Sequence, residues 1–184
     1  MEKLSFDQVK ALIDHIGEEE RHFNQLELEY RKLASQWLLV ALGAIGFVLS
    51  RENQLILPPW TLVMGIALAS SIGIFVLWLL DLKVYHELLH AAFREGVKLE
   101  RDYPEFLPQI RSNMVRSQTG GDIIKRVVYY YFFSMLLLIL IANISVWMGL
   151  LTDAVAITVN IVSAVFMLLL FKIMTRNSVR DLGV

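Results

Sequence analysis

The sequence contains no cysteine among its 184 residues. This absence excludes disulfide scaffolds, thiolate zinc sites, iron–sulfur clusters and cysteine nucleophiles. Charge is also scarce, at 19% of the residues, and it is balanced between 17 Lys and Arg and 18 Asp and Glu. A phosphate-binding surface needs a clear basic excess, so we expect no nucleic-acid partner. The 56% of hydrophobic residues exceeds the roughly 45 to 50% of soluble domains and indicates an integral membrane protein.

Charged residues are entirely absent from four long stretches of the chain. These uncharged runs cover residues 34–50, 58–80, 127–151 and 154–171. A helix needs about 20 residues to cross the hydrocarbon core of a bilayer, with a usual range of about 17 to 25. All four runs fall within this range. The sequence therefore predicts an all-α polytopic protein with four transmembrane helices in contact with the lipid bilayer.

The basic residues are unevenly distributed between the segments outside these runs. Sixteen of the 17 Lys and Arg residues lie in residues 1–33, 81–126 and 172–184, and the remaining one is Arg51. Cytoplasmic loops carry an excess of Lys and Arg. We therefore expect the leader 1–33, the connection 81–126 and the tail 172–184 in the cytoplasm, with both termini inside. The prediction is a single membrane domain, 1–184, most simply in a prokaryotic plasma membrane.

The leader and the long connection have helical patterns of their own. In the leader, one apolar row repeats every seven residues, as in coiled coils. Its members are Val9, Ile16, Phe23 and Tyr30. Residues 81–101 form a second amphipathic pattern, which ends before Pro104 and Pro108 because proline interrupts a helix. These patterns predict helical cytoplasmic extensions of the first two spans.

Within the uncharged runs, the informative residues are small or weakly polar. No ionisable residue is present to mark a proton relay or transport pathway. Gly65, Ala69 and Gly73 recur every four residues, a spacing typical of close helix packing. Asn143 and Asn160 lie at equal distances from the turn between the last two spans. We expect their amides at one depth, either as a structural clasp or as a polar ring lining a pore.

Residues 86–90 read His-Glu-Leu-Leu-His and match the H-E-x-x-H pattern. On a helix this pattern places two imidazole ligands one turn apart, with a carboxylate as general base. The motif resembles that of the gluzincins and of membrane-embedded zinc proteases, which implies zinc held by His86 and His90 and Glu87 as base. Glu100 and Glu105 are the nearest candidates for a third ligand. The alternative is that Glu87 forms a surface ion pair with Lys83, four residues earlier.

A second pattern uses some of the same residues. Glu19-x-x-His22 and Glu87-x-x-His90 have the E-x-x-H spacing found in di-iron carboxylate bundles. If both helices are unbroken, a rise of 1.5 Å per residue puts His22 and His90 at levels about 5 Å apart. The two patterns lead to the hypothesis that zinc, iron or manganese binds at a site formed by Glu19, His22, His86, Glu87 and His90. The alternative is that these residues belong to the helix surface.

Three function classes remain open at this stage. The first is a homo-oligomeric channel-like or membrane-perturbing effector gated through its cytoplasmic helices. Its layout resembles that of small membrane effectors of bacterial defence systems, although no shared motif carries the likeness. The second is a metal-binding protein or metalloenzyme using the histidine cluster. The third is a membrane scaffold that binds a cytoplasmic protein through residues 81–126. No catalytic residue is assigned outside the metal hypothesis.

Overall fold

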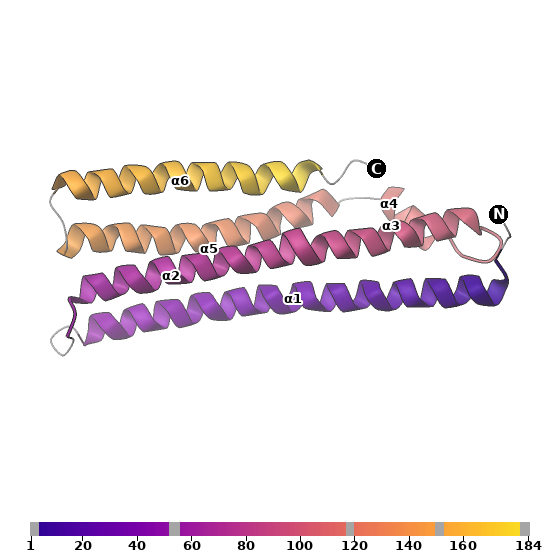
Figure 1. Ribbon diagram of the computed structural model, residues 1–184, viewed down its shortest axis with the longest axis horizontal. Helices are drawn as coiled ribbons and strands as arrows, with labels where there is room; N and C mark the ends of the chain where they lie inside the picture. Colours follow the sequence, from indigo (N-terminus) through magenta and orange to yellow (C-terminus); the bar gives the residue numbers. More distant parts are fainter. Residues whose placement is uncertain (1–3, 52–55, 117–119, 150–152, 181–184) are drawn as a thin grey trace. The chain divides into compact units, whose positions relative to one another are not determined.

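A computed structural model describes residues 4–51, 56–116, 120–149 and 153–180, and within these residues the chain is helical without any strand. Figure 1 shows the helices in chain order. They are α1 (Phe6–Ser50), α2 (Pro59–Leu79), the π-helix η2 (Leu80–Tyr85), α3 (His86–Asp102), α4 (Ile110–Arg116), α5 (Gly120–Gly149) and α6 (Asp153–Arg180). The all-α prediction is confirmed.

Four helices in the described part of the chain are long and apolar enough to cross a membrane. They are Phe6–Ser50, Pro59–Asp102, Ile124–Met148 and Ile157–Met174. Each contains or closely overlaps one of the four uncharged runs, so the prediction of four candidate spans is confirmed. The end of the third run, at residues 150–151, and the end of the tail, at residues 181–184, lie outside the described residues. The assignment of sides by positive charge stays a prediction.

The chain divides into two compact units. The first unit combines residues 1–31 with residues 79–120, and the second combines residues 32–78 with residues 121–184. These divisions fall close to the edges of the first two uncharged runs. The helix α1 contributes its first part to one unit and its last part to the other, without interruption.

In the first unit, the N-terminal part of α1 packs on the segment between α3 and α4. Val9 is completely buried, and the Phe6 ring meets the Phe106 ring edge to face, with centroids 5.6 Å apart. The helix α3 ends at Asp102 and α4 begins at Ile110. Both predicted helix-breaking prolines, Pro104 and Pro108, lie in this gap, because proline cannot supply the N–H group that a helix interior requires.

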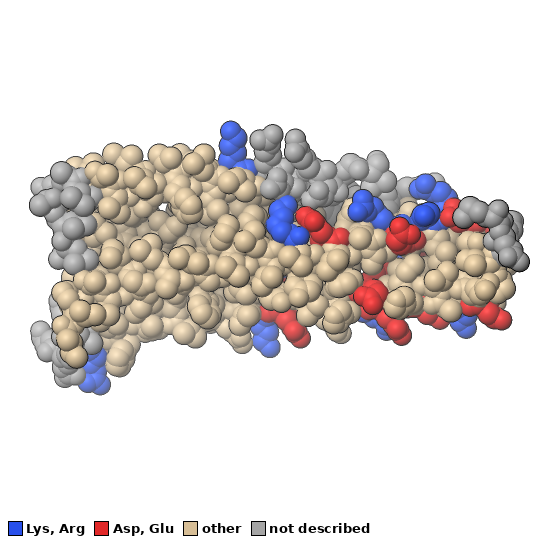
Figure 2. Space-filling model, viewed as in Figure 1, with Lys and Arg blue, Asp and Glu red and all other residues tan. Residues whose placement is uncertain are grey.

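In the second unit, apolar side chains pack between three helices and also cover the outer surface. The core combines α1, α2 and α5 through Ile45, Val48, Val63, Ala67 and Ala142. Figure 2 shows that the visible face of this unit has few charged side chains. Large apolar residues such as Leu39, Val40 and Leu168 are about 70% exposed. Such exposure is expected of a surface that lipid covers.

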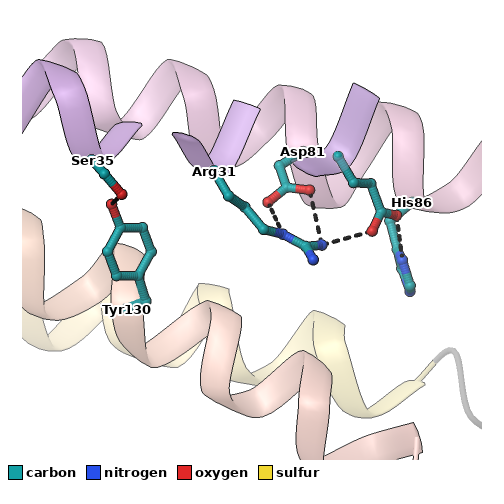
Figure 3. A network of polar contacts seen from close by, with 6 residues as sticks. Arg31, Ser35, Asp81, His86 and Tyr130 are labelled. Carbon is teal, nitrogen blue, oxygen red and sulfur yellow. Dashed lines mark hydrogen bonds and ion pairs between the residues drawn. The ribbon is translucent and has the colours of Figure 1, made fainter. Parts of the chain in front are cut away.

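Polar contacts join α5 to both α1 and α6 in the second unit. Figure 3 shows the Tyr130 hydroxyl of α5 beside the Ser35 hydroxyl of α1, with 2.7 Å between the oxygens. Asn143 of α5 accepts a hydrogen bond from the Ser163 hydroxyl of α6 at 3.1 Å. This bond joins α5 to α6 through Ser163, and the predicted pairing of Asn143 with Asn160 stays a prediction. Asn160 lies one turn before Ser163 and is partly buried.

The predicted small-residue row of α2 divides into two parts. Gly73 faces Trp37 so closely that a Cβ atom there would stand 2.7 Å from the indole nitrogen. At Gly65 a Cβ atom would meet no atom of the described chain within 4 Å, and Ala69 is exposed. Of these three residues, Gly73 is the one that packs closely against another helix in the described part of the chain.

This difference predicts unequal effects of one substitution at the two glycines. Both Gly73→Ala and Gly65→Ala gain the same helix propensity, so their difference in stability isolates the contact with Trp37. We expect Gly73→Ala to be less stable than Gly65→Ala by about 1 kcal/mol, since the indole must move. Thermal unfolding in detergent measures the difference, and tryptophan fluorescence should shift only in Gly73→Ala. Equal melting temperatures and unchanged spectra would contradict the packing role of Gly73.

Candidate functional site

The first unit contains a buried cluster of ionisable side chains next to the π-helix. We call Glu27, Arg31, Asp81 and His86 the Asp81 cluster. Asp81 is completely buried and Glu27 is 5% exposed. Asp81 lies in the first turn of η2, and the His86 N–H, at the other end, donates to the Asp81 carbonyl. π-Helices occur frequently at functional sites, and this one joins two members of the cluster through the backbone.

Arg31 holds both carboxylates of the cluster. Its Nε donates to Asp81 Oδ2 at 2.9 Å, and its Nη2 donates to Asp81 Oδ1 at 3.2 Å and to Glu27 Oε2 at 2.7 Å. Figure 3 shows the Arg31 guanidinium beside the Asp81 carboxylate. A two-point contact between guanidinium and carboxylate is strong and directional. The pair therefore fixes the rotation of α1 about its own axis relative to η2.

The remaining oxygen of Glu27 orients His86. The distance from His86 Nδ1 to Glu27 Oε1 is 2.9 Å. Because a carboxylate only accepts hydrogen bonds, Nδ1 carries a proton in this contact, and Nε2 is an acceptor in the neutral form of the ring. The residues just before Arg31 and His86 also pair, since Tyr30 and Tyr85 stack with ring centroids 5.0 Å apart.

A second polar cluster attaches α4 to α1 and α3. We call Glu20, Glu100 and Arg111 the Arg111 triad. Arg111 Nε and Nη2 donate to the two oxygens of Glu20 at 2.8 and 3.0 Å, and Nη1 donates to Glu100 Oε1 at 3.3 Å. Hydrogen bonding to Glu20 raises the pKa of Arg111, against the opposing effect of burial. The guanidinium therefore carries a permanent charge between two carboxylates.

Glu100 is 1% exposed and also binds the backbone of α4. It accepts hydrogen bonds from the N–H groups of Arg111 and Ser112, each at 3.1 Å. Free N–H groups in the first turn of a helix need such acceptors. Gly96 makes room for this arrangement, since a Cβ atom there would stand 2.7 Å from Cδ and Nε of Arg111. Glu100 is thus a helix-capping residue, although its sequence position suggested a metal ligand.

Between α1, α3 and α4, the first unit contains a cavity of about 480 Å³. Its lining consists of polar residues from all three helices and apolar residues from α3 and α4. The residues are Glu20, Asn24, His86, Leu89, His90, Phe93, Ile110, Arg111 and Met114. The cavity therefore brings together two members of the Arg111 triad, Glu20 and Arg111, and His86 of the Asp81 cluster.

The structure brings together two of the five residues proposed for metal binding. His86 and His90 line the same cavity, with ring centroids 6.4 Å apart. His22 is exposed, and Glu19 is only partly buried. The Glu87 side chain is 59% exposed and lies 4.0 Å from the Lys83 ammonium, which confirms the surface-pair alternative.

Across the described ranges, no three His, Asp or Glu side chains are grouped so that they could hold a metal ion. The hypothesis of a zinc, iron or manganese site therefore gains no support. One reason is that the acids nearest the cavity are already engaged. Glu20 binds Arg111 with both oxygens, and Glu27 is shared by Arg31 and His86.

Sequence reasoning did not identify the Asp81 cluster. One signal was present, since Asp81 is the first charged residue after the run 58–80 and Arg31 lies just before the run 34–50. Two antiparallel helices with opposite charges at matching membrane boundaries favour an ion pair. Comparisons with protein family models, with curated proteins and with solved structures found no match for this chain. Its function must therefore be argued from its own residues.

Proposed function

We propose that the chain is a homo-oligomeric membrane protein that conducts ions or perturbs the bilayer under the control of its cytoplasmic helices. The supporting observation is a set of small residues left uncovered on the uncharged helices. Gly43 and Gly46 of α1 and Gly65 and Ala69 of α2 are exposed. Within the described chain, nothing lies within 4 Å of a Cβ atom placed at any of these glycines. Small residues allow transmembrane helices to approach closely, so a second copy is a suitable partner.

The polar side chains of the second unit support a pathway between copies rather than through one chain. Ser134 and Ser145 donate to carbonyl oxygens of their own helix at 2.8 Å. Ser163 donates to Asn143 on the neighbouring helix. These groups are engaged within the chain, and the uncharged runs contain no ionisable residue. A conducting path between copies needs no polar channel inside the monomer.

Control by the cytoplasmic helices is supported by helix continuity. The helix α1 contains both Arg31 and the first uncharged run, and η2 with Asp81 directly follows the second run. A change in the Asp81 cluster therefore acts on helices that also contain spans. The positive-inside count supports a cytoplasmic position for this cluster.

The test compares self-association in lipid bilayers for variants that add leucine side chains to different apolar helices. We expect Gly65→Leu combined with Ala69→Leu to reduce cross-linked oligomers in liposomes by about tenfold, because the bulk prevents close helix approach. Ala164→Leu is the matched control, since Ala164 is also exposed on an apolar helix, α6. The control should assemble like the wild type. A wild-type protein that stays monomeric in bilayers would contradict the proposal.

Conduction is tested with the same liposomes. Release of a trapped ion-sensitive dye is measured for the wild type and for Asp81→Ala, in which the Asp81 cluster is broken. We expect Asp81→Ala to change the rate of release relative to the wild type, and the Gly65→Leu/Ala69→Leu variant to abolish it. Liposomes that remain tight with both the wild type and Asp81→Ala would overturn the conducting function.

A further inference from the structure

The cavity of the first unit has the size and the mixed lining of a small-molecule site. Its volume of about 480 Å³ falls within the range of roughly 300 to 1,000 Å³ that ligand pockets occupy. Leu89, Phe93, Ile110 and Met114 provide an apolar wall, and Asn24 and His86 provide polar groups. A ligand of this cavity therefore needs an apolar body with a polar end.

The charges around the cavity determine whether the polar end of a ligand should be positive or negative. Glu20 and Arg111 line it directly. Behind the lining, Glu100 binds Arg111, Glu27 binds His86, and Arg31 joins Glu27 to Asp81. Four carboxylates thus surround two guanidinium groups, which leaves a negative balance when the imidazoles are neutral. Such a balance attracts a cation and repels phosphate or carboxylate ligands.

Two acceptors on the lining suit an ammonium ion. His86 Nδ1 lies 2.9 Å from Glu27 Oε1, so in the neutral form of the ring Nε2 is an acceptor. Asn24 adds an amide oxygen. The ring of Phe93 serves an apolar body and attracts cations through its face. We propose that this cavity binds a primary organic ammonium ion with an aromatic-sized apolar body.

The test uses three probes of one shape and three charges, with the full-length protein in nanodiscs of zwitterionic lipid. The probes are 2-phenylethylamine, 2-phenylethanol and 3-phenylpropionate. Titration calorimetry, corrected with empty nanodiscs, measures their binding. We expect the amine to bind about tenfold more tightly than the carboxylate, with the alcohol between them. Equal or tighter binding of the carboxylate would overturn the proposal.

Substitutions at the lining locate the binding without dismantling the ion pairs. Asn24→Asp should strengthen amine binding severalfold and Asn24→Lys should weaken it by a similar factor, because the two introduce opposite charges at an exposed position. Phe93→Ala should weaken all three probes, whereas Leu88→Ala, on the same helix but outside the cavity, should leave them unchanged. Amine binding that none of the cavity substitutions alters would place the ligand elsewhere and contradict the assignment. Ligand binding in this measurement requires neither an oligomer nor conduction. Its result is therefore independent of whether the proposed function is correct.

Discussion

Asp81→Ala should destabilise the first unit by about 2 to 3 kcal/mol. Removing one partner of a buried ion pair costs about 3 to 5 kcal/mol, because the other charge stays buried without its counter-charge. We expect a smaller loss for Asp81→Ala because the Arg31 side chain is 29% exposed and keeps its bond to Glu27. Chemical denaturation in detergent measures the loss. Hydrogen exchange should show it first in the amides of residues 27–31 and 80–86.

Two further variants separate loss of the ion pair from loss of packing. Arg31→Met combined with Asp81→Leu and Glu27→Gln removes all three charges that the guanidinium brings together, and it should regain most of the lost stability. Glu87→Ala, which removes an exposed acid 4.0 Å from Lys83, should change stability by less than about 0.5 kcal/mol. If Asp81→Ala is as stable as Glu87→Ala, the cluster does not stabilise the unit.

The spans could be predicted from the sequence because their signal is local. Each uncharged run is long enough by itself to identify a helix that can cross a membrane, and the pairing of side chains across helices has no part in the argument. The Asp81 cluster has no such local signal. Its main contact joins Arg31 to a residue 50 positions later, and it depends on how each helix is rotated.

The π-helix explains why the rotation of α3 about its own axis could not be predicted from the sequence. The expected faces of residues 81–101 assumed about 100° of rotation per residue throughout. In η2 the bond from the His86 N–H reaches back five residues to Asp81, so the turn is wider and the phase of later residues changes. A helix face continued from the second run across η2 would therefore be out of phase with the faces of α3.

The prediction of metal-binding residues in α1 also depended on how the helix is rotated. The E-x-x-H pattern selected Glu19, but the acid that lines the cavity is its neighbour Glu20. One position along a helix turns the side chain by about 100°. Spacing within one helix therefore identified which residues share a face, but it could not establish which face meets α3 and α4.

Arg111→Ala should release α4 from the first unit. The Arg111 side chain is 16% exposed and that of Glu100 is 2% exposed. The substitution therefore leaves the buried Glu100 carboxylate with hydrogen bonds to backbone N–H groups and without its counter-charge. It also removes three charge-assisted hydrogen bonds to Glu20 and Glu100. Each such bond contributes about 1.5 to 3 kcal/mol, and we expect a net loss of about 3 kcal/mol because Glu20 regains water. Hydrogen exchange of residues 110–116 should rise strongly, and protease should cleave near Phe106 sooner.

The geometry of the guanidinium provides the control for this prediction. Arg111→Lys retains the charge but lacks the two-point contact with Glu20, so it should restore only part of the protection. Arg94→Ala removes an exposed arginine of α3 and should leave α4 protected.

Gly96→Val tests the same contact from the other side, since its side chain would occupy the place of Arg111 Cδ and Nε. It should expose α4 while leaving every charge of the Arg111 triad in place. Protection of α4 that survives both Arg111→Ala and Gly96→Val would mean that apolar contacts, not the Arg111 triad, attach it.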